Sequence, residues 1–336
     1  PSPPPLCAHH PLPSARSIRG VEIRGTGRLI NEQLANLQIR RVNVTTPAGM
    51  LIAAVLDTFF YRWLAGRTGG NLLTPLYAAA AEVFRQRIST EAPDRMNWFL
   101  SISGFLTLGA IGLAVVPVGP QSAVIGLETS VVLWGACESL VVVLVFLHGW
   151  SPNSPLALIG AYRYVAIGLP IMLLSMFVLI AAALPAESLD LRAIVTSQED
   201  LWNVIRQPLG LPLFILLGLS LTLRGPLDYA DSADLAGGTS IEDSGANRAG
   251  WQVARMSMLV GFSAVAASAF LGGYLGPVLP GVVWLGFKTL TIMAVIIALS
   301  HLLARMPVAR MLGLIWKVLL PIAFLDLLLA GLVALA

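Results

Sequence analysis

Eight long apolar runs constrain the fold of this chain more than any other feature. The runs fall at residues 47–65, 98–118, 122–148, 157–185, 207–223, 251–275, 281–303 and 314–336. Helices of about this length cross the hydrocarbon core of a bilayer, which is about 30 Å thick. Lipid offers no hydrogen-bond partner to the backbone, so each run must fold as a helix. The pattern predicts an all-α integral membrane protein with about eight transmembrane helices and polar cytoplasmic loops.

Composition supports lipid as the solvent of this chain. Hydrophobic residues make up 56% of the sequence and charged residues only 12%, whereas a soluble domain usually has about a quarter charged residues. The formal net charge of +3 comes from arginines in short connections, a pattern typical of membrane orientation and not of nucleic-acid binding. Cys7 and Cys137 are far apart and form no CxxC pair. We therefore expect the chain to hold no metal or iron–sulfur cluster by itself.

The arginines also predict a topology. They gather in the connections after the first, third, fifth and seventh runs, which places these connections in the cytoplasm. The only lysines are Lys288 and Lys317, a bias typical of a GC-rich bacterial genome, so we expect the helices to lie in a bacterial inner membrane. Residues 1–46 are also rich in arginine, although both termini would then lie outside. This polar segment is disordered, forms a short interfacial helix over 28–41, or is not native sequence. Residues 47–336 form the transmembrane domain.

Two cytoplasmic connections carry polar residues whose role the pattern leaves open. The first, 66–97, contains an amphipathic stretch from Leu72 to Phe84 that favours a helix lying at the membrane interface. Another, 224–250, gathers five acids. A solvated loop or a docking surface for a basic partner explains this cluster, and composition alone favours that interpretation. The alternative is a row of carboxylates that leads protons towards buried groups. The acids are Asp228, Asp231, Asp234, Glu242 and Asp243.

An ordered set of segments resembles a known family. The segments are LLTPLYAAAAEVFRQR, GWSPNSPLALIGAYR, WNVIRQPLG, GPLDYADSADLAGGTSIEDSG and IWKVLLP. Their order resembles the quinone-site membrane subunit of respiratory complex I, often called NuoH. That family includes the related subunit of membrane-bound hydrogenases and formate hydrogenlyases. The resemblance spans roughly residues 57–325 and includes the helix number.

The resemblance implies a role for the cytoplasmic loops, which in the family form the lower part of a quinone chamber and begin a proton path. Pro226 and Asp228 match the opening of the family's acidic loop, and Glu242 matches its Glu-Tyr-Ser-Gly stretch. Arg163 matches the arginine that follows the Gly-Trp loop, and Asp57 replaces an acid at the end of the first helix. The candidates for the cavity or the proton path are Arg163, Asp228, Asp231, Asp234, Glu242, Glu138, Asp57, Arg62 and Arg85.

Three positions depart from the family's pattern. Met172 and Arg255 stand where the family has glutamates, and Ile167 replaces a glutamine. Methionine cannot exchange a proton and arginine stays protonated, so the usual glutamate relay is incomplete. Glu138 lies within an apolar run, and either forms a structural pair with Lys288 or Arg255 or transfers protons.

The sequence indicates no definite chemical role for the other polar residues within the apolar runs. Lys288 and Asp326 are charged residues that could compensate for the missing glutamates. His148 and His301 lie at helix ends, where a lone histidine is typically an interfacial residue, and we expect no catalytic role for either.

The resemblance implies a subunit that performs no redox chemistry alone. It would anchor peripheral iron–sulfur subunits of a complex I-like oxidoreductase to antiporter-like membrane subunits, and line a quinone site at the interface with its partners. One alternative is the anchor of a membrane-bound hydrogenase or formate hydrogenlyase-type complex. Another is a structural or transport subunit that keeps the fold without a redox role.

Overall fold

The computed structural model describes residues 46–64, 66, 74–120, 122–231 and 237–335. The predicted polar segment 1–46, except its last residue, and Asp234 lie outside these ranges. In the described ranges all regular structure is helical. The helices are 46–64, α2 (Thr74–Phe84), α3 (Arg95–Val115), α4 (Ser130–Trp150), α5 (Pro155–Ala183), α6 (Leu191–Thr196), α7 (Asn203–Arg206), α8 (Gly210–Leu221), α9 (Gly245–Phe270), α10 (Gly281–Leu302), α11 (Val308–Leu314) and α12 (Leu320–Leu335).

The prediction of an all-α membrane protein is confirmed. Among the described residues, six helical segments are long and apolar enough to cross a membrane: α3, α4, α5, α9, α10 and the continuous segment from α11 to α12. The other two predicted spans correspond to helix 46–64 and to α8. α8 has only 12 residues, which rise about 18 Å. It cannot cross the bilayer alone.

The predicted start of the third span was wrong. The sequence predicts one helix over 122–148, but α4 begins at Ser130. The preceding apolar residues form turns, in which Val118 N donates to Ser122 O and Ile125 N donates to Ala114 O. Pro117, Gly119 and Pro120 account for the end of α3, because proline removes a backbone donor and glycine disfavours a helix. Within the stretch before α4, Gly126 also disfavours a helix.

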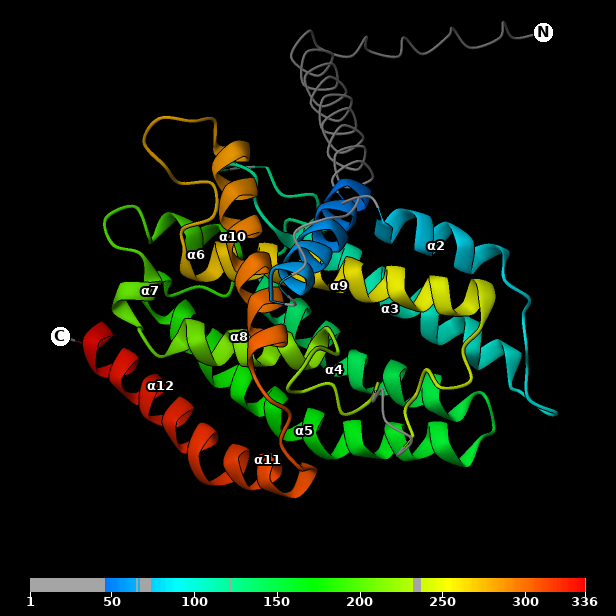
Figure 1. Ribbon diagram of the computed structural model, residues 1–336. Coiled ribbons are helices and arrows are strands. Elements are labelled where there is room, and N and C mark those ends of the chain that lie inside the picture. Colours follow the sequence, from blue (N-terminus) through cyan, green and yellow to red (C-terminus); the bar gives the residue numbers. More distant parts are fainter. Residues whose placement is uncertain (1–45, 65, 67–73, 121, 232–236, 336) are drawn as a thin grey trace, which may run out of the picture.

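Of the six segments long and apolar enough to cross a membrane, α9 is the most buried, and it lies beside α3 in Figure 1. It packs against α3 on one side and α10 on another, while α5 packs against α4 and α12. The contact with α3 is very close: a Cβ added at Gly261 would lie 2.3 Å from the carbonyl oxygen of Gly109. Small residues at such contacts allow membrane helices to approach and gain packing energy. The contact fixes the second half of α9 against α3.

Two helices have local features with clear sequence causes. α2 has no buried residue, and it occupies most of the stretch from Leu72 to Phe84 in which the sequence predicts an interfacial helix. Between α11 and α12 lies a π-helical turn, Ile315–Leu319. Pro321 follows it closely, and a proline within a helix removes one hydrogen bond and displaces the carbonyl four residues earlier.

Candidate functional site

One arginine joins three segments of the chain at the end of the bundle where α8 stops. Arg224 Nη1 donates to Asp57 Oδ1 over 3.0 Å, and His301 Nε2 lies 2.8 Å from the same oxygen. Helix 46–64, the loop after α8 and the end of α10 are therefore held together by charge. Burial lowers the pKa of the Arg224 guanidinium, and the Asp57 carboxylate opposes that shift.

A second arginine holds the end of α8. Arg255 forms an ion pair with Asp231, and its guanidinium also donates to the carbonyl oxygens of Leu223 and, over 3.3 Å, Thr222. The hydroxyl of Ser240 donates to the other Asp231 oxygen. Carbonyls at a helix C-terminus lack intrahelical donors and attract cations. Arg255 is thus a structural cation, and its position explains why a charged residue is tolerated there.

A third arginine fixes the middle of the same loop. Arg305 Nε lies 3.4 Å from Asp228 Oδ1, and its guanidinium carbon lies 5.3 Å from the centre of the Tyr229 ring. Tyr229 in turn donates to the carbonyl oxygen of Met306 over 2.7 Å. Burial raises the pKa of the Asp228 carboxyl, and Arg305 opposes that shift.

These contacts define an ion-pair cluster. Three arginines face three aspartates, so the formal charges cancel when His301 is neutral. Asp57, Asp228 and Asp231 were predicted as site residues from the resemblance. The three arginines and His301 were not among the candidates, because their pairing depends on residues far apart in the sequence. The cluster comprises Asp57, Arg224, Asp228, Asp231, Arg255, His301 and Arg305.

The other loop candidates make contacts elsewhere. Arg163 Nη1 donates to the carbonyl oxygen of Gly237 over 3.3 Å, and Glu242 Oε1 accepts from Ser154 over 2.8 Å. Both contacts fasten the second half of the loop to α5 and the residue before it. The remaining two candidates have local contacts at or beside the exposed α2. Arg62 donates to Thr74 over 2.8 Å, and Arg85 pairs with Glu82 over 3.0 Å.

The interpretation of His148 as an interfacial residue was wrong. Its side chain is completely buried, with Nε2 2.8 Å from Asp243 Oδ2 and Nδ1 3.1 Å from Ser101 Oγ. The imidazole stacks on Trp251 with 3.7 Å between ring centres and 4° between planes. Trp98 Nε1 donates to the second Asp243 oxygen over 3.1 Å. Asp243 is thus the acid of the loop that enters the helix bundle.

His301 likewise is not a lone histidine, since it contacts Asp57. One feature of the sequence could have suggested acidic partners for the two histidines. Both histidines lie at the ends of apolar runs, and the same chain has an acidic loop. No spacing in the sequence connects His148 with Asp243.

The predicted structural pair of Glu138 with Lys288 or Arg255 was also wrong. Glu138 Oε2 accepts from the Ser175 hydroxyl over 2.6 Å, whereas Arg255 pairs with Asp231. Lys288 donates to the carbonyl oxygen of Leu275 over 2.7 Å, and its amino group lies 4.6 Å from the centre of the Trp202 ring. These three charged residues therefore have different partners and form no pair with one another.

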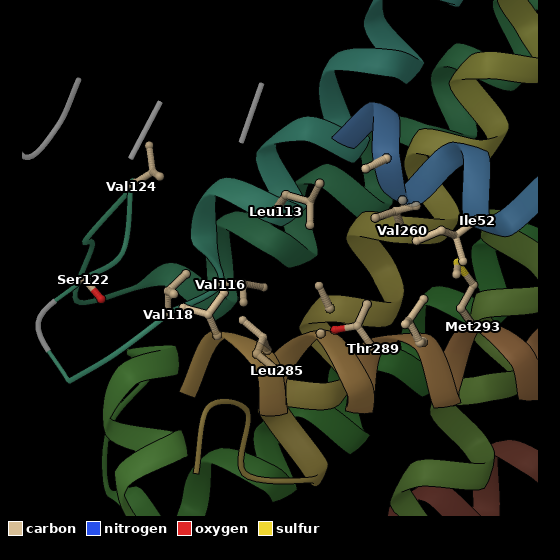
Figure 2. A pocket seen from close by; sticks show the side chains of 16 residues that line it. Ile52, Leu113, Val116, Val118, Ser122, Val124, Val260, Leu285, Thr289 and Met293 are labelled. Atoms are coloured by element: carbon tan, nitrogen blue, oxygen red, sulfur yellow. The ribbon is translucent and has the colours of Figure 1, made fainter. Parts of the chain in front are cut away.

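An apolar cavity of about 550 Å³ is lined by none of the residues of the ion-pair cluster (Figure 2). Its walls come from helix 46–64, the end of α3, α9 and the first half of α10; Ile52, Leu113 and Val260 are typical. Thr289 contributes a hydroxyl to the lining. Along the chain, the lining residue Ile52 lies five residues before Asp57, and Met293 lies eight residues before His301, which correspond to about 7.5 Å and about 12 Å of helix rise. The cavity contains none of the predicted site residues.

Metal binding receives no support from the described part of the chain, where no group of three or more His, Cys, Asp or Glu is arranged to hold an ion. The polar groups that converge on the cluster are guanidinium, imidazole and carboxylate. They can donate hydrogen bonds, accept them, and exchange protons. Such a site can orient a small polar ligand and move protons.

Comparison with known proteins gives consistent results. Residues 48–331 match the model of a protein family described as NADH dehydrogenase. A protein of Rhodopseudomonas palustris strain HaA2, named as an H-type subunit of NADH-quinone oxidoreductase, is 32% identical over 298 residues, covering 85% of this chain and 93% of the relative. The protein of the same name from strain BisB5 is 30% identical over 306 residues, covering 88% and 96%. A second H-type subunit of this oxidoreductase, from strain ATCC BAA-98 / CGA009, is 30% identical over 244 residues, covering 72% and 76%.

Proposed function

The chain belongs to the NADH dehydrogenase family, and on that premise we propose that it anchors the peripheral electron-transfer subunits of a complex I-like oxidoreductase and lines part of its quinone chamber. It is a multi-pass membrane protein, and the proposed location is the inner membrane of a bacterium. The observation that carries the proposal is the ion-pair cluster, which fixes a polar loop against helix 46–64, α9 and the end of α10.

The cluster suits the wall of a chamber for a quinone headgroup. A bound quinone would accept electrons from partner subunits, and its carbonyl oxygens would require hydrogen-bond donors. Arg224 Nη2 faces the thioether of Met256 over 3.6 Å. Sulfur is a weak acceptor that a carbonyl oxygen could replace. His301 can hold or release a proton beside Asp57. The opposed aspartates keep the arginines in place before any ligand arrives.

Exposed side chains on α2 support the anchoring role. Phe84 is 88% exposed and Tyr77 is 65% exposed, and large aromatic residues at this exposure are usually covered by a partner or by lipid. The proposed partners are peripheral iron–sulfur subunits on this side and antiporter-like subunits within the membrane. The segment after α2 is tied to the residue before α9, because Ser244 Oγ accepts from Ile88 N and donates to Ile88 O.

Purification of the native assembly through a tag on this chain tests the proposal. Mass spectrometry should recover iron–sulfur subunits and antiporter-like membrane subunits. Extraction of quinone from the assembly should abolish electron transfer, and added quinone should restore it. Electron transfer that is unchanged after extraction would overturn the quinone assignment. Recovery of neither class of subunit would favour a structural or transport role.

The permanent charge of Arg255 favours a second candidate function. An arginine that stays protonated cannot relay protons as a glutamate does, and here it is committed to Asp231 and the end of α8. Such a chain suits the anchor of a membrane-bound hydrogenase or formate hydrogenlyase-type complex, in which protons accept the electrons. Hydrogen evolution by the assembly in quinone-depleted membranes would support this candidate over the first.

A further inference from the structure

Glu138 is a carboxyl group buried in the middle of a membrane helix with neutral neighbours. It lies near the centre of α4 and is 0% exposed. Ser175 of α5 donates to Oε2 over 2.6 Å. Trp134, one helical turn earlier, approaches the carboxyl, but within the described residues neither its indole nitrogen nor Glu138 Oε1 completes a hydrogen bond. Buried polar atoms without such a bond are few in folded proteins and require an explanation.

The face of α5 opposite Glu138 can be identified from close contacts. A Cβ at Gly135 would meet the side chain of Met176, and one at Gly168 would lie 3.2 Å from Val142 Cγ2. Glu138 lies between Gly135 and Val142, so it faces the part of α5 between Gly168 and Met176.

Met172 shares this face of α5. Gly168, Met172, Ser175 and Met176 follow the spacing i, i+4, i+7 and i+8, which is one stripe of a helix. Met172 is buried and precedes Ser175, the hydrogen-bond partner of Glu138, by three residues. A carboxyl group at position 172 would therefore lie within about one helical turn of the depth of Glu138, on the facing helix.

The helices around Glu138 bring no charged side chain to it among the residues that the structure describes. Arg95 begins α3 and Arg163 lies in the first third of α5. On α9, Arg248 pairs with Glu82 and Arg255 with Asp231. The groups that face the carboxyl are the Cys137 thiol on its own helix, the Trp134 indole and, from α5, the Ser175 hydroxyl. An isolated ionised carboxylate is costly at such a site, so its charge has to be transient.

We propose that Glu138 is a proton-binding group of the membrane interior, which takes up a proton at Oε1 to form the neutral carboxyl and releases it again. Ser175 holds Oε2 and fixes the orientation of the group. The step moves one proton and no electron. The proposal rests on the function proposed above, because the protons are those that accompany electron transfer to quinone.

Infrared difference spectroscopy on the purified assembly tests proton binding directly. A change of pH should produce a carboxyl C=O band that is lost in Glu138→Gln and shifted in Ser175→Ala, because a freed carbonyl absorbs at higher frequency. Asp326→Asn, which alters a second buried membrane acid bonded to the neutral Gln207, is the matched control and should leave the Glu138 band in place. A spectrum of Glu138→Gln identical to that of the unchanged protein would overturn the proposal.

Proton translocation by the assembly in closed vesicles tests the role in coupling. In Glu138→Gln, protons moved per electron should fall by about tenfold or more, because an amide cannot exchange a proton. Adding Met172→Glu to this variant should restore translocation, since it returns a carboxyl group to nearly the same depth. Translocation at the unchanged ratio in Glu138→Gln would refute the role, as would failure of the double variant to recover in an assembly of intact subunit content.

These experiments distinguish the two proposals. Absence of electron transfer to quinone in the unchanged assembly would refute the proposed function. The infrared bands would still decide whether Glu138 binds a proton.

Discussion

Acids at the loop-facing end of the bundle and acids in the membrane interior have different kinds of partner. Asp57 and Asp231 each face an arginine, and Asp243 faces His148. Glu138 and Asp326 instead accept hydrogen bonds from the neutral Ser175 and Gln207. The acids of the first group hold separate segments of the chain together. An acid with a neutral partner can change its charge without losing a counter-ion. Acids in the membrane interior are therefore better suited to proton exchange than acids at the loop-facing end.

The largest loss of stability is expected from Arg255→Met. This variant leaves the largely buried Asp231 without its cation and removes a donor from two carbonyls at the end of α8. Breaking such a pair typically costs about 3–5 kcal/mol in the free energy of unfolding, which SDS titration of the purified protein measures. Replacing both partners, Arg255→Met with Asp231→Leu, should recover much of this loss.

Arg248→Met is the matched control for that experiment. Its guanidinium is half exposed and lies 3.9 Å from Glu82, and surface changes of this kind usually stay within about 0.5 kcal/mol. If Arg255→Met and Arg248→Met lowered the free energy of unfolding equally, Arg255 would contribute no more to stability than an arginine at the surface.

A somewhat smaller loss is expected from His148→Phe. Phenylalanine preserves an aromatic ring against Trp251 but leaves one Asp243 oxygen buried without a partner. The expected cost is about 2–3 kcal/mol in the free energy of unfolding. The same substitution in an Asp243→Asn background should cost less, because the buried charge is then absent. Equal costs in both backgrounds would show that His148 stabilises by packing alone.

Amide substitution sharpens the comparison between the two groups of acids. Glu138→Gln should change the free energy of unfolding by less than about 1 kcal/mol, because an amide oxygen still accepts from Ser175. Asp231→Asn, beside Arg255, should cost about 2–3 kcal/mol, since it leaves a buried cation without its carboxylate. Parallel SDS titrations compare the two. A larger loss for Glu138→Gln would place Glu138 with the structural acids.

The smallest effect is expected from filling the apolar cavity. Gly286 lines it, and an added Cβ there would meet no atom within 4 Å. Gly286→Leu should raise the free energy of unfolding by about 0.5–1 kcal/mol, because glycine is a poor helix former. Gly331→Leu in α12, where a Cβ also meets open space, is the control. Destabilisation by the first variant alone would mean that the cavity tolerates no filling.

The sequence was sufficient to predict the long helices and most of the acidic residues of the candidate site. Apolar runs identified the six membrane-crossing segments, since a bilayer demands length and hydrophobicity, which are local properties. The start of α4 was misplaced because Val124 and Ile125 are apolar but lie outside the helix. Hydropathy does not distinguish a buried turn from a helix.

The cations of the site could not be predicted in the same way. Asp57 and Arg224 are separated by 167 positions, and His148 and Asp243 by 95. Their pairing depends on how the long helices pack, and no local spacing reports it. Glu138 was found from its place in an apolar run, but its true partner, Ser175, is an ordinary serine in the sequence.

The shortness of α8 leaves part of the membrane thickness to be crossed by other backbone. Twelve residues rise about 18 Å, against about 30 Å for a membrane core. The remaining thickness is crossed by irregular backbone, which membranes tolerate only when protein groups satisfy its carbonyls. Arg255 provides that satisfaction at Thr222 and Leu223. The length of one helix thus ties a polar cluster to the point where the regular backbone ends, because the arginine that caps this end also holds the acidic loop.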